Sequence, residues 1–267
     1  MSWIMGFRLG LKLWSTNTGS LAGAAERLFA EGAFDYIELF VVPGSLATLP
    51  EWRRLHNAAA IPFVIHNAHT AQGFNLAKRE MESRNREIFG ETRRFADALA
   101  AEHVIFHGGT DGDVAETVRQ LKAFGERRAL IENKPFVPLP NDAGVKFCRG
   151  ATAEELERII DGAGCGFCLD IGHAVCSANS QGLEPYAFAS DLARRFRPEM
   201  FHLSDVTDMA SPYDAHPHLG MGELDILRIC REILPSDATV TIETVRDSLT
   251  DLEDFRRDAD CLKSVVI

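Results

Sequence analysis

The 267-residue chain is predicted to be an α/β protein, a (β/α)8 TIM barrel that forms a single domain over residues 1–267. Short apolar stretches alternate eight times with longer amphipathic ones. The apolar stretches have no polar face, which is typical of parallel strands covered by helices. Eight such units in a chain of this length fit one closed barrel of about 250 residues. An open doubly wound sheet is the alternative, but it usually has a glycine-rich loop after its first strand, and residues 13–17 contain no glycine.

In the first half of the chain, four expected strands are each followed by an expected helix. The strands are the apolar stretches at residues 7–13, 36–40, 63–66 and 104–107. The helices have apolar residues at helical intervals, and they span residues 21–31, 51–60, 80–100 and 113–124. Gly32 follows the first helix and Pro62 follows the second, and both residue types end helices.

The second half of the chain repeats this alternation. Strands are expected at residues 129–132, 166–170, 200–203 and 239–243, and helices from Thr152 onward and at residues 186–196, 225–233 and 250–263. Thr152 is followed three residues later by Glu155, which has the character of a capping box, and Asp225 is expected to cap its helix. The connections at residues 133–151 and 204–222 are long for a compact domain, and such loops usually serve function.

Composition limits the classes of partner. The formal net charge is −11, which opposes binding to a polyanion because basic side chains must displace counterions there. We therefore expect no nucleic-acid partner. No apolar run approaches the ~20 residues that span a bilayer, so we expect no membrane partner. Six cysteines without the pattern of a secretion signal are typical of reduced thiols in the cytoplasm. The oligomeric state stays open.

Six of the expected strands end in a side chain that can bind a metal. These residues are His66, His107, Glu132, Asp170, His202 and Glu243, and nearby segments add His173, Asp214 and His216. Each alone could be a hydrogen-bonded core residue or part of a salt bridge. The strand ends of a barrel converge on one pocket, however, and several carboxylates buried without cations would cost several kcal/mol apiece. Mixed imidazole and carboxylate ligands favour zinc, with manganese or iron as alternatives. The pattern therefore predicts a metal site.

The segments around these residues resemble the AP endonuclease family 2, or xylose isomerase-like, TIM barrel superfamily. They are Ile131-Glu132-Asn133, Leu169-Asp170-Ile171-Gly172-His173, Phe201-His202-Leu203-Ser204-Asp205, Asp214-Ala215-His216-Pro217-His218-Leu219-Gly220-Met221-Gly222-Glu223 and Ile242-Glu243-Thr244. The superfamily contains endonuclease IV and many isomerases and epimerases of sugars and sugar phosphates. The order of the motifs is specific to the superfamily and much less specific to one reaction.

The resemblance implies one to three divalent metal ions. By the endonuclease IV pattern, three groups of ligands would form: His66, His107 and Glu132; Glu132, Asp170, His202 and Glu243; and His173, Asp214 and His216. All nine positions are filled. The sugar isomerases typically need only the second group, in which the two glutamates resemble an acid/base pair.

The leading functional expectation is a metal-dependent isomerase or epimerase of a small sugar or sugar phosphate, working by an enediolate-type proton transfer. In endonuclease IV the loop after the first ligand histidine carries bulky side chains, whereas here only Phe74 could stack on a base. The alternatives are an endonuclease IV-like phosphodiesterase and a binding protein without activity. The candidate catalytic residues are Glu132, Glu243 and His173, and the candidate substrate-binding residues are Glu38, Asn75, Lys134 and Arg149.

Other residues stay open or receive a structural interpretation. Lys12 could face the pocket, as could Glu38, and His69 and His218 neighbour candidate ligands. Lys146 could meet a phosphate in the same way as Lys134, or be a solvated loop charge. Cys165 and Cys168 lie on one expected strand and are predicted to pack in the core.

Overall fold

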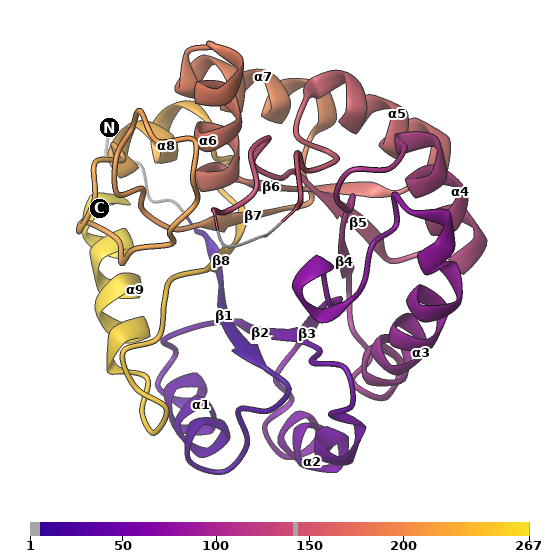
Figure 1. Ribbon diagram of the computed structural model, residues 1–267. Helices are drawn as coiled ribbons and strands as arrows, with labels where there is room; N and C mark the ends of the chain where they lie inside the picture. The colour runs from indigo at the N-terminus through magenta and orange to yellow at the C-terminus, as the bar shows by residue number, and fades with distance from the viewer. Residues whose placement is uncertain (1–5, 141–143, 267) are drawn as a thin grey trace.

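The computed structural model describes residues 6–140 and 144–266. Over these residues, eight parallel strands form a closed barrel in the order β1 to β8, each paired with its sequence neighbour and β8 paired with β1. Figure 1 shows the helices arranged as an outer ring around the strands. The predicted TIM barrel is therefore confirmed. None of the described helices is both long and apolar enough to cross a membrane.

The strands agree with the predicted ranges to within one residue. They are β1 (Arg8–Trp14), β2 (Tyr36–Phe40), β3 (Phe63–His66), β4 (Val104–His107), β5 (Ala129–Glu132), β6 (Gly166–Asp170), β7 (Met200–Leu203) and β8 (Thr239–Ile242). The sixth strand runs directly into a helix, and the others into loops. Since all strands are parallel, their carboxyl ends meet at one end of the barrel.

The ring of helices contains one member that the sequence analysis did not predict. The helices are α1 (Ser20–Ala30), α2 (Leu49–Ala59), α3 (Glu82–Ala98), α4 (Val114–Phe124), α5 (Ala153–Ala163), α6 (Ile171–Gln181), α7 (Pro185–Phe196), α8 (Ile226–Glu232) and α9 (Glu253–Val266), with short 3-10 turns at Leu46–Thr48, Thr70–Gln72 and Arg79–Met81. The additional helix is α6. Its residues from Ile171 through Ala178 are all buried, so the sequence has no polar face by which to recognise it.

Helix caps fix where several helices begin. Asp170 ends β6 and accepts a hydrogen bond from the backbone N–H of His173 at 2.7 Å, which starts α6. Thr152 Oγ1 accepts from the N–H of Glu155 at 3.2 Å, and Asp225 accepts from Arg228 at 2.9 Å. The caps at Thr152 and Asp225 confirm the predictions, although the Glu155 side chain bonds elsewhere and does not complete a capping box.

The inside of the barrel has its own small core, separate from the larger core between strands and helices. It consists of Tyr36, Val64, Ile105, Leu130, Cys168 and Met200. Cys168 belongs to this inner core and Cys165 packs against the outer one, as predicted. Burial raises the pKa of both thiols to about 12, so neither is a reactive thiolate near neutral pH.

The ring of Tyr36 fits inside the barrel because residue 10 has no side chain. A Cβ atom at Gly10 would lie 2.3 Å from the Tyr36 ring. The Tyr36 hydroxyl in turn lies 2.7 Å from Thr241 Oγ1 on β8. The inner core is therefore tied to the layer of polar side chains above it.

We predict that Gly10→Ala destabilises the barrel by about 1 to 3 kcal/mol, the usual effect of overpacking a filled core. Urea unfolding followed by circular dichroism measures this. Gly90→Ala is the matched control, because Gly90 is exposed on α3 and a Cβ atom added there would have no other side chain within 4 Å, so this change should be neutral or stabilising. Equal unfolding midpoints for the two variants would contradict the prediction.

Candidate metal centre

The structure brings the nine predicted ligands together at the carboxyl end of the barrel. They form three groups, and within each group one ligand atom per residue lies within 4.8 Å of the others: His66, His107 and Glu132; Glu132, Asp170, His202 and Glu243; His173, Asp214 and His216. Five come from strand ends, Glu243 follows β8 directly, His173 lies in the first turn of α6, and Asp214 and His216 lie in the loop after β7.

In the first group, two imidazoles face one carboxylate oxygen. The Nε2 atoms of His66 and His107 each lie 2.9 Å from Glu132 Oε2. His66 Nδ1 lies 2.8 Å from the carbonyl oxygen of Asn67, which can only accept, so Nδ1 carries the proton. His66 Nε2 then presents a lone pair to an oxygen that also only accepts. A cation between these atoms would satisfy both.

In the second group, four buried side-chain atoms have no hydrogen-bond partner among the residues that the structure describes. They are Glu132 Oε1, Asp170 Oδ2, His202 Nδ1 and Glu243 Oε2, one from each member of the group. His202 Nδ1 lies only 2.7 Å from Glu243 Oε2. Because unpaired buried polar atoms are rare and costly, their convergence on one point fits a site for a divalent ion. Glu132 directs one oxygen to each of the first two groups, as a bridging ligand would.

The third group is less buried than the other two, and a lysine side chain contacts one of its members. Asp214 Oδ2 lies 3.1 Å from His173 Nε2 and 2.6 Å from His216 Nε2. His173 Nδ1 lies 2.9 Å from the carbonyl oxygen of Asn133, so it is also the protonated nitrogen. Lys134 Nζ lies 3.2 Å from His173 Nε2. His216 has a φ of 47°, an uncommon conformation for a side chain other than glycine.

Glu38 supports a candidate ligand. It is fully buried, and its Oε2 accepts from His202 Nε2 at 2.8 Å and from Thr241 Oγ1 at 2.7 Å. Its other oxygen lies 3.0 Å from Lys12 Nζ. Glu38 therefore holds the tautomer of His202 that leaves Nδ1 for a metal, as partners of metal-binding histidines commonly do. These contacts give Glu38 a supporting role, and its role in substrate binding stays a prediction.

Two other predicted substrate-binding residues have structural partners. Asn75 is buried and bonds through both side-chain atoms to the backbone of Thr110 and Ala77. The Arg149 guanidinium bonds to the carbonyl of Asp111 and to Glu155. Both residues hold loops together in these contacts, and their role in substrate binding stays a prediction. Phe74, the residue expected to stack, is buried against Phe106 and Phe124 and cannot reach a base.

The remaining open residues divide between the site and the surface. His69 is stacked on His107, with ring centroids 5.2 Å apart. His218 instead bonds to Asp258 and Asp247, and Lys146 is exposed. Lys12, which the sequence left open, contacts Glu243 Oε1 at 2.6 Å. Its position opposite Glu38 depends on the register between β1 and β2, which the sequence does not show.

The charges of the centre depend on one another. Burial alone would raise the pKa of Glu132, but His107 and His202 outweigh it, and the pKa lies well below the ordinary value. The pKa of Asp170 is raised by burial. A metal in the second group would lower the pKa of Asp170, because a nearby cation favours the charged carboxylate.

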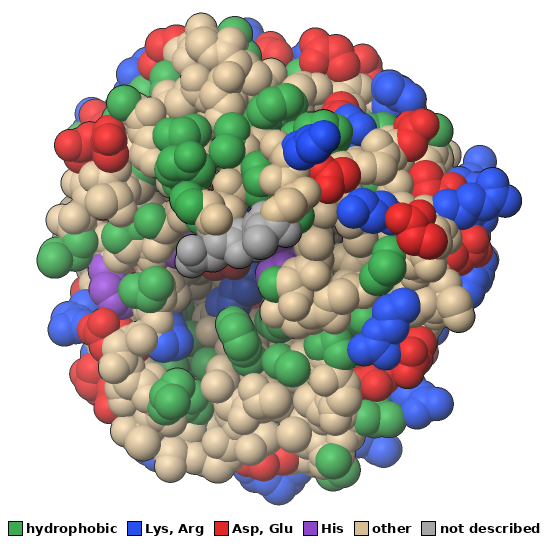
Figure 2. Space-filling model, viewed as in Figure 1, with side chains coloured by type: hydrophobic (Ala, Val, Ile, Leu, Met, Phe, Trp, Pro, Cys, Tyr) green, Lys and Arg blue, Asp and Glu red, His purple; other side chains and the backbone are tan. Residues whose placement is uncertain are grey.

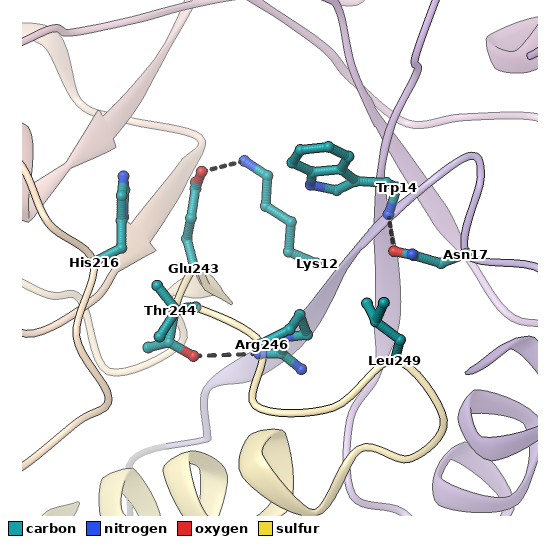
Figure 3. Close-up of a pocket in the computed structure, with 9 residues that line it drawn as sticks. Lys12, Trp14, Asn17, His216, Glu243, Thr244, Arg246 and Leu249 are labelled. Carbon is teal, nitrogen blue, oxygen red and sulfur yellow. Dashed lines mark hydrogen bonds and ion pairs between the residues drawn. The ribbon is translucent and has the colours of Figure 1, made fainter. Parts of the chain in front are cut away.

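Two cavities open beside the centre, and Figure 2 shows the hollow between the loops with basic and histidine side chains inside it. The larger cavity measures about 370 Å³ and is lined by Lys12, Trp14, Asn17, His216, Glu243, Thr244, Val245, Arg246 and Leu249. Figure 3 shows Lys12 and Glu243 pointing toward each other, with Trp14 beside them. The smaller cavity, of about 160 Å³, includes His69, His107, Lys134 and Asp214.

Comparison with known proteins identifies similar chains. The family model for the xylose isomerase-like TIM barrel matches residues 27–265. A relative from Mycobacterium ulcerans named probable endonuclease 4 is 28% identical over 214 residues, which cover 75% of this chain and 80% of the relative. The crystal structure of endonuclease IV from Thermus thermophilus superposes with a TM-score of 0.69 at 25% identity, covering 96% of this chain and 99% of that one. A D-tagatose 3-epimerase-like protein has the same TM-score at 20% identity, covering 96% of each chain, and shows the shared fold.

We predict that Glu132→Gln removes metal from two of the three groups, because this carboxylate directs one oxygen to each. Metal analysis of purified, desalted protein should show a stoichiometry about two ions below that of the wild type, as loss of a bridging ligand implies. Glu154→Gln is the control, since Glu154 is exposed on α5. Full metal content in Glu132→Gln would refute the bridging assignment.

We also predict that chelation lowers the thermal stability. A hundredfold excess of metal over its dissociation constant contributes about 2.7 kcal/mol, which corresponds to roughly 5 to 10 °C for a chain of this size. Differential scanning calorimetry before and after treatment with a chelator measures the shift. Chelator already saturated with zinc should leave the melting temperature unchanged. Identical melting of loaded and stripped protein would contradict the prediction.

Proposed function

Because the chain belongs to the family of xylose isomerase-like TIM barrels, we propose that it is a metal-dependent enzyme that isomerises or epimerises a small sugar or sugar phosphate. The observation that supports this most is the cavity beside Glu243. Its volume of about 370 Å³ lies within the roughly 300–1,000 Å³ usual for small-ligand sites.

The walls of this cavity suit a molecule with many oxygens and one apolar face. Lys12 and Glu243 form its polar wall, and Trp14 and Leu249, which are both more than half exposed, form its apolar wall. A sugar ring has hydroxyl groups at its edge and C–H groups on its faces. Such a ring could place its oxygens toward Lys12 and the candidate ligands while one face packs on the Trp14 indole.

In this proposal the second group holds the metal that acts on the substrate. A divalent ion there would polarise the carbonyl oxygen and the neighbouring hydroxyl oxygen. Glu243 is the base, because its Oε2 faces the ligand group and its Oε1 faces the cavity at Lys12. Both oxygens of Glu132 are directed to ligand groups, so Glu132 acts as a ligand. His173 likewise belongs to the ligands and not to the proton-transfer residues.

The charge around Glu243 keeps its carboxyl group deprotonated. Burial would raise its pKa, but Lys12 and His202 outweigh that effect, and the pKa lies well below the ordinary value. Glu243 is therefore a carboxylate at neutral pH. It can remove a proton from the substrate carbon next to the carbonyl and return it on the same face to the adjacent carbon, which isomerises the substrate, whereas epimerisation requires a second proton donor on the opposite face. Lys12 is placed to donate a hydrogen bond to the oxygen on which negative charge develops.

A second candidate function is an endonuclease IV-like phosphodiesterase. The complete set of nine ligands and the relatives named probable endonuclease 4 support it, so nucleic acid stays among the candidate substrates. Against it stand the net charge of −11 and the burial of Phe74, which leaves the loop after His66 without the stacking side chain expected there.

We predict that the metal-loaded protein exchanges substrate protons with solvent. Incubation with a panel of ketoses, aldoses and their phosphates in deuterium oxide should introduce deuterium next to the carbonyl, as NMR would detect. Glu243→Gln should slow the exchange by at least about a hundredfold, the usual contribution of a general base, whereas Glu154→Gln should not.

A nicking assay on abasic duplex DNA separates the two candidates. Exchange with at least one sugar and no nicking would support the proposed function. Nicking that depends on Glu132 and Glu243, without exchange on any sugar of the panel, would overturn it in favour of the phosphodiesterase.

A further inference from the structure

The ammonium group of Lys134 contacts His173 Nε2, the ring nitrogen that would otherwise face a metal ion in the third group. Its Nζ lies 3.2 Å from His173 Nε2. The preceding residue, Asn133, accepts from the other ring nitrogen of His173 through its carbonyl oxygen, at 2.9 Å. Two consecutive residues after β5 therefore occupy both nitrogens of one candidate ligand.

The protonation of His173 follows from these contacts. The Asn133 carbonyl can only accept, so Nδ1 carries a proton, and the Lys134 ammonium can only donate, so Nε2 is the acceptor in that contact. Asp214 Oδ2 lies 3.1 Å from the same Nε2, so the imidazole nitrogen, the carboxylate and the Lys134 ammonium group meet at one point. An ammonium group has three donors and no acceptor. Lys134 supplies the positive charge that this arrangement needs.

This contact distinguishes the third group from the other two. In the first and second groups, the ring nitrogens directed at the ligand clusters contact carboxylate oxygens. The only other lysine of the described residues in the centre, Lys12, contacts the Glu243 oxygen that is directed away from the ligand group. Lys134 is partly exposed and also lines the smaller cavity, so its flexible stem has room to move away from His173.

We propose that Lys134 is a built-in cation at the third position, so that two divalent ions bind tightly and a third binds only when the ammonium group leaves. This inference rests on the metal centre of the proposed function. A fixed positive charge a few ångströms from His173 Nε2 opposes a divalent ion at the same point, since like charges at short range in a pocket are weakly screened. The protein would then bind two metal ions, although its nine candidate ligands form three groups.

The test measures binding of Co²⁺ and Zn²⁺ to metal-free protein by calorimetry and by the absorption of Co²⁺. In the wild type, two ions should bind tightly and a third at least about tenfold more weakly, as the neighbouring charge requires. In Lys134→Met the third ion should bind at least about tenfold more tightly than in the wild type, by the same reasoning, with the first two unchanged.

Two controls locate the effect. Lys146→Met removes the same charge from an exposed position of the same loop and should behave like the wild type. His216→Ala in the Lys134→Met background should abolish the gain, because the additional ion depends on His216. Circular dichroism checks folding, and Lys134→Gln replaces Lys134→Met if that variant does not fold.

Several outcomes would overturn the inference. Three equally tight ions in the wild type would do so while leaving the proposed function intact. A third ion that is unchanged or weaker in Lys134→Met, or a gain that survives His216→Ala, would show that Lys134 does not compete at this position. Binding of no metal by either protein would overturn both the inference and the proposed function.

Discussion

The carboxylate of Glu132 is the group on which the arrangement of this protein depends. It is buried at the end of β5, and four histidine nitrogens approach it: two at 2.9 Å, from His66 and His107, one at 3.0 Å and one at 3.6 Å. A buried anion is tolerated only when positive charge or hydrogen-bond donors surround it. The histidines come from β3, β4, α6 and β7, so the carboxylate is compensated only once the barrel has closed. Folding of the barrel and assembly of the centre are thus one process.

The same centre is chemically compatible with two reactions, which place different demands on its surroundings. Divalent ions can stabilise negative charge on a carbonyl oxygen or on a phosphate. The difference lies in what the βα loops present to a substrate. Here the loop after β3 buries its aromatic side chain, Phe74, in the core, whereas β1 exposes the indole of Trp14 beside a cavity of small-molecule size. Loops of a barrel vary without altering its core, which explains how one family accommodates both endonucleases and epimerases.

Sequence alone predicts this fold well because its signals are local. The strands are apolar on both faces and can be recognised one by one. Because the carboxyl ends of barrel strands line the active site, the metal-binding side chains His66, Glu132 and Asp170 could be located without a structure. The failures have physical causes. Helix α6 is buried over eight consecutive residues and has no amphipathic pattern. The direction and partner of a side chain depend on register between strands, which a single sequence does not contain. The contact of Glu38 with His202, and the contacts by which Asn75 and Arg149 join loops, could therefore not be predicted.

The hydrogen bonds that run from Tyr36 through Thr241 to Glu38 and His202 have a consequence for how this chain can evolve. The Thr241 hydroxyl donates its one proton to Glu38, so Tyr36 must donate to Thr241. The deepest layer of the barrel is thereby joined in series to a candidate metal ligand. The residues that pack the inside of this barrel and the candidate metal ligands are therefore structurally coupled. A substitution at the bottom of the barrel reaches the imidazole of His202, so neutral drift in the core is expected to be accompanied by compensating changes around the centre.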